Sequence, residues 1–325
     1  MIGKFLYSQW LVTPPMPTHD FTGKTVLVTG SNVGLGKEAA RHFVRLNAGT
    51  VILAVRSLDK GEAAKTDIEA TTGRKEVIKV MHLDLSSYAS TLSFADKLSQ
   101  EVERLDVAVL NAGVIRGEWQ VFEQDESTIT VNVVSTFLLA FALLPQLRAT
   151  AEKFGVRPTM TVVSSEVHAW TNFTERNAPE GGIFARLNEP VVDGKKVNLL
   201  DRYQVSKLME ILFVRAWCGK FPKEKIPVTI NTVNPGYCHS EFGRETGLVD
   251  ASMRFVFARS TEVGSRTLVH AASHGAESHG AYFDDCKIAG PSAYVRSEEG
   301  AKDGERVWKE LIDKLEGIKS GVTKN

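Results

Sequence analysis

Short apolar runs alternate with helical segments along most of this chain, and no other feature of the sequence restricts its fold as strongly. Runs rich in β-branched residues stand at 24–30, 50–55, 77–85, 106–113, 159–165 and 228–236, and helical patterns fill 36–48, 59–72 and 86–105 between the first of them. Strands separated by helices form βαβ units, and right-handed crossovers then place parallel strands in one sheet with helices on both faces. The sequence therefore predicts an α/β fold with a doubly wound parallel sheet.

A single domain of this kind accounts for nearly the whole chain. The 325 residues show no repeat, low-complexity tract or break in composition, so we expect one domain over 21–325. The prolines at 14, 15 and 17 predict an extended N-terminal arm over 1–20, packed across its own domain. Two long irregular segments, 166–201 and 237–259, follow strand ends where such sheets bind ligands, and we expect both to be substrate loops.

The composition argues against several classes of partner. Hydrophobic residues make up 43% and charged residues 24%, as in ordinary globular proteins. Because Lys+Arg and Asp+Glu both number 39, the net charge is zero and gives no support for nucleic acid or membrane as a partner. The three scattered cysteines suit a reducing compartment, and no segment resembles a targeting signal, so we expect a cytoplasmic protein. Peripheral membrane contact through aromatic residues near the N-terminus is the alternative.

The first strand runs directly into a glycine-rich turn, TGSNVGLG at 29–36. Glycines at 30, 34 and 36 allow a tight turn, close approach of a phosphate to the backbone and close packing of helix on strand. The N-terminus of the following helix offers free N–H groups to a pyrophosphate. The spacing is GxxxGxG rather than GxGxxG, and its place between the first strand and helix predicts a dinucleotide site on a Rossmann fold.

The stretch RYQVSK places Tyr203 four residues before Lys207. On a helix these positions share one face, and an ammonium beside a phenol lowers the pKa of that phenol. A tyrosine tuned in this way exchanges protons near neutral pH. Taken alone, the hexapeptide also fits a surface tyrosine on a solvated basic helix.

Seven short motifs follow one another in an order that resembles the short-chain dehydrogenase/reductase family. They are TGSNVGLG at 29–36, LDL at 83–85, NAG at 111–113, VNVVSTF at 131–137, VVSS at 162–165, YQVSK at 203–207 and NPG at 234–236. The resemblance covers residues 21 to about 315. More narrowly, the chain is similar to the retinol-dehydrogenase-like branch, and within it to fungal ketoreductases.

The resemblance implies a catalytic set of four residues. Tyr203 would be the general acid in carbonyl reduction, or the base in alcohol oxidation, and Lys207 would lower its pKa and hold the nicotinamide ribose. Ser165, rather than Ser164, would orient the substrate oxygen, and Asn132 would hold a water behind the lysine. The serines could also merely end a strand, and Asn132 could be an ordinary hydrogen-bonding residue of a helix.

The resemblance also implies a cofactor-binding set. Asn111 is expected mainly as a structural tie between strands, and Asp84 either accepts from the adenine amino group or caps the next helix. Ser240 stands where the family often has threonine. The complete set is Gly30, Asn32, Gly34, Leu35, Arg56, Asp84, Leu85, Asn111, Ala112, Gly113, Tyr203, Lys207, Pro235, Gly236 and Ser240.

The end of the second strand indicates which cofactor is used. An acidic residue there accepts from the adenosine ribose and repels a 2′-phosphate, but this chain has Val55 followed by Arg56. A guanidinium suits a phosphate, so NADP(H) is expected. The alternative is an arginine in a solvated turn.

The expected substrate is a lipophilic small-molecule carbonyl or alcohol, because both substrate loops carry large apolar side chains, some of which could instead be packing residues. These are Trp170, Phe173, Phe184, Phe242, Met253, Phe255 and Phe257. We expect a ketone reductase, with oxidation of a retinol- or steroid-like alcohol and a non-catalytic NADP(H)-binding sensor as alternatives. No metal site is expected, since His270 and His274 lack a third ligand at useful spacing. The apolar stretch 135–147 fits either the core or half of a homodimer interface.

Overall fold

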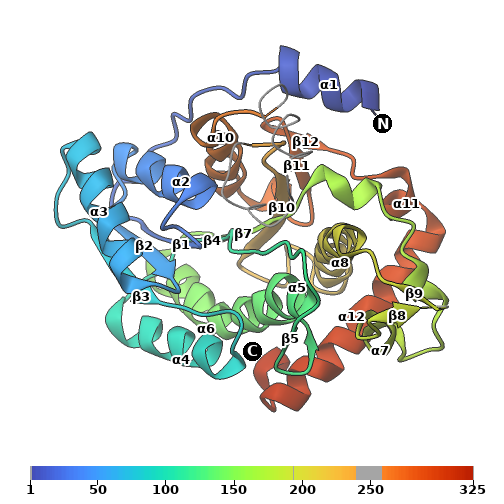
Figure 1. The fold of residues 1–325 in the computed structure, drawn as a ribbon. Coiled ribbons are helices and arrows are strands. Elements are labelled where there is room, and N and C mark those ends of the chain that lie inside the picture. The colour runs from blue at the N-terminus through green and yellow to red at the C-terminus, as the bar shows by residue number, and fades with distance from the viewer. Residues whose placement is uncertain (1, 193, 239–257, 325) are drawn as a thin grey trace.

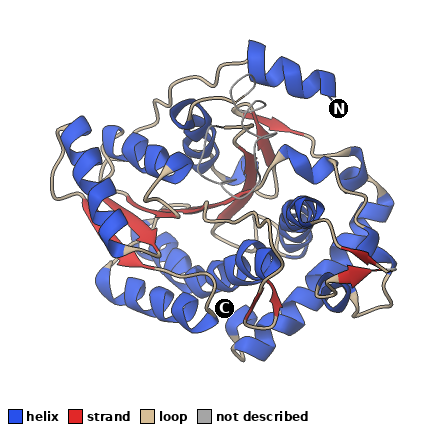
Figure 2. Cartoon of the chain, in the orientation of Figure 1, coloured by secondary structure: helices blue, strands red, loops and turns tan. Residues whose placement is uncertain are grey.

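A single large sheet runs through the middle of the molecule with helices on both faces (Figures 1 and 2). The structure, a computed structural model, describes residues 2–192, 194–238 and 258–324. Within these ranges the large sheet has eight strands in the order β12-β11-β10-β7-β4-β1-β2-β3. Their bounds are β1 Thr25–Thr29, β2 Thr50–Val55, β3 Ile78–His82, β4 Val107–Leu110, β7 Thr159–Val163, β10 Thr229–Asn234, β11 Tyr282–Asp284 and β12 Lys287–Ala289.

The predicted doubly wound α/β sheet is confirmed. All six expected strands form, and they pair in parallel. Two further strands were not expected: β11 continues the parallel arrangement beside β10, and β12 runs antiparallel to β11 at the edge. Because β1 lies between β2 and β4, the chain winds outward from the middle in two directions, and the switch between β1 and β4 marks the ligand-binding edge of such a sheet.

Two apolar cores lie against the two faces of the sheet, each closed by its own layer of helices. One layer consists of α2 (Gly34–Arg45), α3 (Leu58–Thr72) and α10 (Thr261–Ala272). The other consists of α4 (Tyr88–Glu101), α6 (Thr136–Phe154), α8 (Leu199–Lys220) and α12 (Glu298–Ile318).

The remaining elements are short and lie mostly in the connections. They are β5 Val121–Phe122, β6 Asp125–Glu126, α5 Ser127–Ile129, the π-helical η1 Thr130–Ser135, η2 Glu166–Ala169, η3 Thr174–Asn177, α7 Ile183–Leu187, β8 Val191–Val192, β9 Lys195–Lys196, η4 Ala276–Ser278, α11 Ala293–Arg296 and η5 Val322–Lys324.

The apolar helix α6 belongs to the core. Within the described residues, the helical stretch Ser127–Phe154 is long and apolar enough to cross a membrane, but 94% of its most apolar window is buried inside the protein. Of the two expectations for 135–147, burial therefore supports the core.

The N-terminal arm differs from the expectation. Residues Ile2–Leu11 form a helix, α1, and only the proline-containing part that follows is irregular (Figure 1). The Arg259 guanidinium holds this helix in place, because its Nη2 donates to the Ser8 carbonyl at 2.5 Å, to Ser8 Oγ at 2.9 Å and to the Val12 carbonyl at 3.2 Å. Asp285 Oδ1 balances the charge of Arg259 at 2.6 Å.

The segment 166–201 is more ordered than a long irregular loop. It contains η2, η3, α7 and the β8–β9 hairpin, and Arg306 of α12 donates to the carbonyls of Arg176, Ala178 and Pro179. Most of the other expected substrate loop, 237–259, lies outside the described residues.

Candidate active site

The glycine turn forms a cradle in which two positions leave no space for a side chain. Gly30 has φ +65°, and a Cβ there would come within 2.9 Å of the Ala112 Cα. A Cβ on Gly36 would stand 2.5 Å from the Gly30 carbonyl oxygen and 2.6 Å from Asn111 Nδ2. Val33, which precedes α2, provides no side-chain cap for the first helical turn. A close backbone approach and an uncapped helix N-terminus are what a pyrophosphate requires.

Thr29 joins the carboxyl ends of β1 and β4 beside this cradle. Its Oγ1 accepts from the backbone N–H groups of Asn111 at 3.0 Å and Ala112 at 2.9 Å. The Asn111 amide donates to the Thr29 carbonyl at 2.9 Å. Asn111 is thus placed as a tie between strands, and Gly113 follows it along the same edge of the sheet.

Asp84 closes the turn before α4 without capping that helix. Its Oδ1 accepts from Ser86 N at 2.9 Å and from Ser86 Oγ at 2.8 Å, whereas the N-cap of α4 is Ser87, whose side chain accepts from Ser90 N. The neighbouring Leu85 is buried in the core. On the other side of the cradle, Leu35 packs against the second core and Asn32 is half-buried in the turn.

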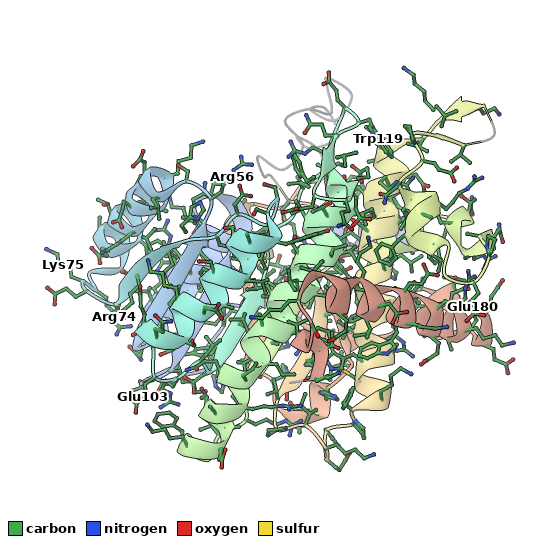
Figure 3. The ribbon with its side chains drawn as sticks, turned by 90° about the horizontal axis from the view of Figure 1, so that it is seen from below. Arg56, Arg74, Lys75, Glu103, Trp119 and Glu180 are labelled. Atoms are coloured by element: carbon green, nitrogen blue, oxygen red, sulfur yellow. The ribbon has the colours of Figure 1, made fainter. Side chains whose placement is uncertain are left out.

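The end of β2 carries an exposed cation. Val55 is buried, whereas Arg56 is exposed and immediately precedes Ser57, the N-cap of α3. Figure 3 labels Arg56 and Trp119, which follow β2 and β4, on one side of the molecule, and Glu103, which precedes β4, on the other. Arg56 therefore belongs to the carboxyl edge of the sheet, where the cradle lies.

Ser165 and Tyr203 meet at the carboxyl end of β7. Tyr203 lies on α8, one turn inside its N-terminus, and the Ser165 side chain lies near enough to its phenol to lower the pKa of that phenol. His168 fixes the Ser165 backbone: its Nδ1 lies 2.7 Å from the Ser165 carbonyl, and its Nε2 accepts from Ser292 N at 2.9 Å. The Nδ1 nitrogen is therefore the one that carries the proton.

Lys207 lies one turn beyond Tyr203, and its ammonium donates to two acceptors within the protein. Nζ donates to the Val163 carbonyl at 2.9 Å and to Glu210 Oε1 at 2.7 Å. It stands 5.8 Å from the centre of the Tyr203 ring. The sequence predicted the lysine beside the tyrosine, but it did not predict Glu210, whose only signal is its spacing of three residues from Lys207 on the same helix.

Asn132 lies in the π-helical segment η1, a kind of distortion that is frequent at functional sites. Its Nδ2 donates to Ser206 Oγ and to the Val114 carbonyl, both at 3.0 Å, and its Oδ1 accepts from Val114 N at 2.8 Å. Asn132 thereby links the segment after β4 to helix α8, next to Lys207.

The prediction that Lys207 lowers the pKa of Tyr203 is wrong for this structure. Burial raises the pKa of Tyr203 and the charge of Glu210 raises it further, against a smaller lowering by the Ser165 side chain. Burial also raises the pKa of Glu210 to about 7, although Lys207 and the nearby Ser164 side chain act in the opposite direction. The phenol is therefore protonated at neutral pH.

Pro235 and Gly236 form a turn at the end of β10 that contacts the N-terminal helix. Gly236 has φ +77°, and a Cβ there would stand 2.9 Å from Arg259 Nη1 and 3.0 Å from Gln9 Nε2. Helix α1 therefore closes on this turn, a contact that the sequence did not suggest. Ser240 lies outside the described residues.

His270 of α10 contacts His274, which lies two residues past the end of that helix, and His274 also contacts a neighbouring carboxylate. His274 Nε2 lies 3.2 Å from His270 Nε2, and His274 Nδ1 lies 3.0 Å from Glu277 Oε1. Within the described ranges, no group of three or more His, Cys, Asp or Glu side chains is arranged to hold a metal ion.

A glycine cradle at the switch point, with a serine, a tyrosine and a lysine beside it, defines a dinucleotide-binding oxidoreductase. A model of the family described as short chain dehydrogenase matches residues 24–165. The short chain dehydrogenase/reductase dmxR8 of Cryptosporiopsis sp. (strain 8999) is 51% identical over 323 residues, which cover 99% of this chain and 99% of that protein. The short-chain dehydrogenase anuD of Penicillium roqueforti (strain FM164) is 40% identical, covering 98% of this chain and 84% of that protein.

The fold has close neighbours among solved structures as well. A crystal structure of an uncharacterised protein from Mycobacterium paratuberculosis matches with a TM-score of 0.69 at 24% identity, covering 92% of this chain and 96% of that one. The chain belongs to the short-chain dehydrogenase/reductase family of nicotinamide-dependent oxidoreductases.

Proposed function

We propose that this enzyme uses NADP(H) to interconvert a carbonyl and an alcohol on a lipophilic small molecule, and that its main task is to reduce a ketone. The observation that carries the proposal is the placement of the Ser165 side chain beside the Tyr203 phenol, with Lys207 one turn further along α8. A positioned phenol beside a hydroxyl is the donor pair that a carbonyl oxygen needs when it becomes an alcohol.

Each of these residues has a distinct part in the reduction. The nicotinamide supplies the hydride when it is bound. Ser165 orients the substrate oxygen by a hydrogen bond, and Tyr203 gives its phenolic proton to that oxygen. Burial and Glu210 raise the pKa of Tyr203 and keep the phenol protonated at neutral pH, which supports the acid role over the base role that oxidation would require.

The choice of NADP(H) rests on the end of β2. Arg56 is exposed at the carboxyl edge of the sheet, and Val55 offers no carboxylate that would repel a phosphate. A guanidinium binds phosphate oxygens by charge-assisted hydrogen bonds. Gly30 and Gly36 would admit the pyrophosphate, and Lys207 would hold the nicotinamide ribose.

The proposal of a lipophilic substrate is supported by fewer residues than the sequence suggested. Phe173 and Phe184 are buried in the core and serve packing, and the candidates at 242, 253, 255 and 257 lie outside the described residues. Of the predicted apolar residues, Trp170 remains a candidate, because its side chain is 47% exposed. It lies directly after η2, the short helix whose N-cap is Ser165. Leu200 is 52% exposed, three residues before Tyr203 on α8. Two exposed apolar side chains so close in sequence to Ser165 and Tyr203 suit an apolar substrate.

Turnover with a panel of carbonyl compounds tests this function. The purified protein should oxidise NADPH with aromatic or polyketide-like ketones faster than with short polar ones, and faster than it oxidises NADH. Steroids and retinoids, offered as alcohols with NADP⁺, test the oxidative alternative on the same protein. Tyr203→Phe, which binds cofactor but lacks the proton donor, is the matched control. Cofactor binding without turnover of any compound in either direction would instead support the non-catalytic sensor.

A further inference from the structure

The Lys207 ammonium has a buried counter-charge that the proposed reaction does not use. Glu210 Oε1 lies 2.7 Å from Lys207 Nζ, and the two side chains are 2% and 5% exposed. Both residues lie on α8, three positions apart, and the Val163 carbonyl completes the surroundings of the ammonium at 2.9 Å. The lysine that should act on Tyr203 is thus partly neutralised from its other side.

Helix α8 carries two buried ion pairs, which differ in the cation that each carboxylate meets. Glu175 pairs with Arg202, and Glu210 pairs with Lys207, one turn from Tyr203. Glu210 Oε2 and Glu175 Oε2 are both buried without a hydrogen-bond partner among the described residues, so this feature does not separate the two pairs. A buried ion pair offers little net stability over an apolar pair of similar size. The choice of Lys207 as its partner therefore places Glu210 to act on the chemistry at Tyr203.

The groups around Glu210 can be named. Lys207 on the same helix and Ser164 at the end of β7 both act on its carboxylate. Among the described elements that pack against α8, η2 carries Glu166 and His168, and α12 carries charged residues along its length, but none of these contributes to the shift in the pKa of Glu210. The negative charge of Glu210 raises the pKa of Tyr203. Glu210 thus responds to Lys207 and acts on Tyr203.

We propose that Glu210 is a positioning residue, which holds the Lys207 ammonium and, by gaining or losing a proton, sets how strongly that ammonium acts on Tyr203. The inference rests on the proposed function in one respect, since it takes Tyr203 as the proton donor. With Glu210 ionised, the positive charge beside Tyr203 is compensated. With Glu210 protonated, the ammonium acts alone and makes the phenol a stronger acid.

The direction of the pH dependence follows from these states. Burial raises the pKa of Glu210 to about 7, so the carboxyl is protonated below that pH and ionised above it. Ketone reduction should therefore slow as the pH rises through about 7. A Gln at position 210 imitates the protonated form and should remove this dependence.

The direct test follows the phenolate absorbance of the cofactor-free protein. Four proteins are compared: native, Glu210→Gln, and each of these combined with Tyr203→Phe. In the native background, Tyr203→Phe should remove no absorbance change up to about pH 11, because Tyr203 stays protonated. In the Glu210→Gln background, the phenolate absorbance that Tyr203→Phe removes should begin at a lower pH than in the native background, because burial then acts on Tyr203 without the carboxylate charge. Equal titrations in the two backgrounds would overturn the proposal.

Helix α8 offers a matched control in a second buried ion pair. Arg202 Nη1 lies 2.6 Å from Glu175 Oε1, with side chains 2% and 9% exposed, and Glu175 does not contribute to the pKa shift of Tyr203. Glu175→Gln also removes one buried carboxylate that pairs with a cation of α8. It should lower the melting temperature without exposing the phenolate. If Glu175→Gln changes the titration as Glu210→Gln does, general loosening explains both and the proposal fails.

The pH profile of turnover is the second measurement. From about pH 6 to pH 8, kcat for ketone reduction should fall roughly three- to tenfold in the native enzyme and stay within about twofold in Glu210→Gln. Glu210→Asp, which keeps the charge, should restore the slope. A native protein that turns over no carbonyl contradicts the proposed function, whereas the titration of the cofactor-free protein still decides the role of Glu210.

Discussion

Gly36→Ala tests the cradle at its tightest point. The added methyl group would stand 2.5 Å from the Gly30 carbonyl oxygen and 2.6 Å from Asn111 Nδ2, so backbone or a tied side chain must move. Overpacking of this kind costs about 1–3 kcal/mol. Displacing the Asn111 amide from the Thr29 carbonyl would add about 1 kcal/mol, and the better helix propensity of alanine would return about 1 kcal/mol. The net loss of unfolding free energy should be about 1–3 kcal/mol.

Thermal unfolding and NADPH binding measure the two consequences of this change. A loss of this size should lower the melting temperature by roughly 3–8 °C. NADPH binding, followed by quenching of tryptophan fluorescence, should weaken as well, because the N-terminus of α2 is displaced from the position that a pyrophosphate needs.

Gly219→Ala is the matched control, since it makes the same chemical change on α8, where a Cβ would meet nothing within 4 Å. It should be neutral or stabilise by about 0.5–1 kcal/mol and leave NADPH binding unchanged. The cradle geometry would be refuted if Gly36→Ala melted with or above the native protein and bound NADPH normally.

Three further changes test the rest of the site. Tyr203→Phe should lower kcat for ketone reduction at least about a hundredfold and leave NADPH binding nearly intact; native turnover in the folded variant would exclude Tyr203 as the acid. Arg56→Ala should raise KM for NADPH by about ten- to a hundredfold, while KM for NADH changes little, and adding Val55→Asp should reverse the preference; an equal loss for both cofactors would contradict the proposed phosphate contact. Arg259→Ala removes the hydrogen bonds to Ser8 and Val12. Amide hydrogen exchange in residues 2–12 should therefore become at least about tenfold faster. Unchanged exchange would show that other contacts hold the helix.

The sheet could be predicted because its strands are buried on both faces. Five of the six expected strands have few or no exposed residues, and each therefore appears in the sequence as a continuous apolar run. The exception, β3, has two buried positions separated by an exposed and a half-buried one, and it ends on an exposed residue. The strands β11 and β12 have only three residues each, too few for any periodicity to show.

Helix α1 was missed because the polarity of its residues 7–11 is the reverse of what a helix on a core usually shows. Its polar residues Ser8 and Gln9 are buried, while Tyr7, Trp10 and Leu11 are exposed. The buried group that this helix meets is the Arg259 guanidinium, which needs oxygen acceptors rather than apolar contacts. A pattern of hydrophobic residues cannot anticipate a partner that lies about 250 positions away in the sequence.

The electrostatics of the site depend on which neighbour the Lys207 ammonium contacts, and the sequence does not determine this contact. Helical spacing puts Tyr203, Lys207 and Glu210 on neighbouring positions of one face, so the sequence can bring a phenol, an ammonium and a carboxylate together. The side chain of lysine is long enough to turn toward either neighbour, and only the surroundings decide between them. Here the ammonium lies between Glu210 and the Val163 carbonyl, both buried, where a charge must have close partners. The pKa of Tyr203 therefore shifts in the direction opposite to the one expected. While Glu210 is ionised, Lys207 does not lower this pKa, and burial together with the Glu210 carboxylate raises it.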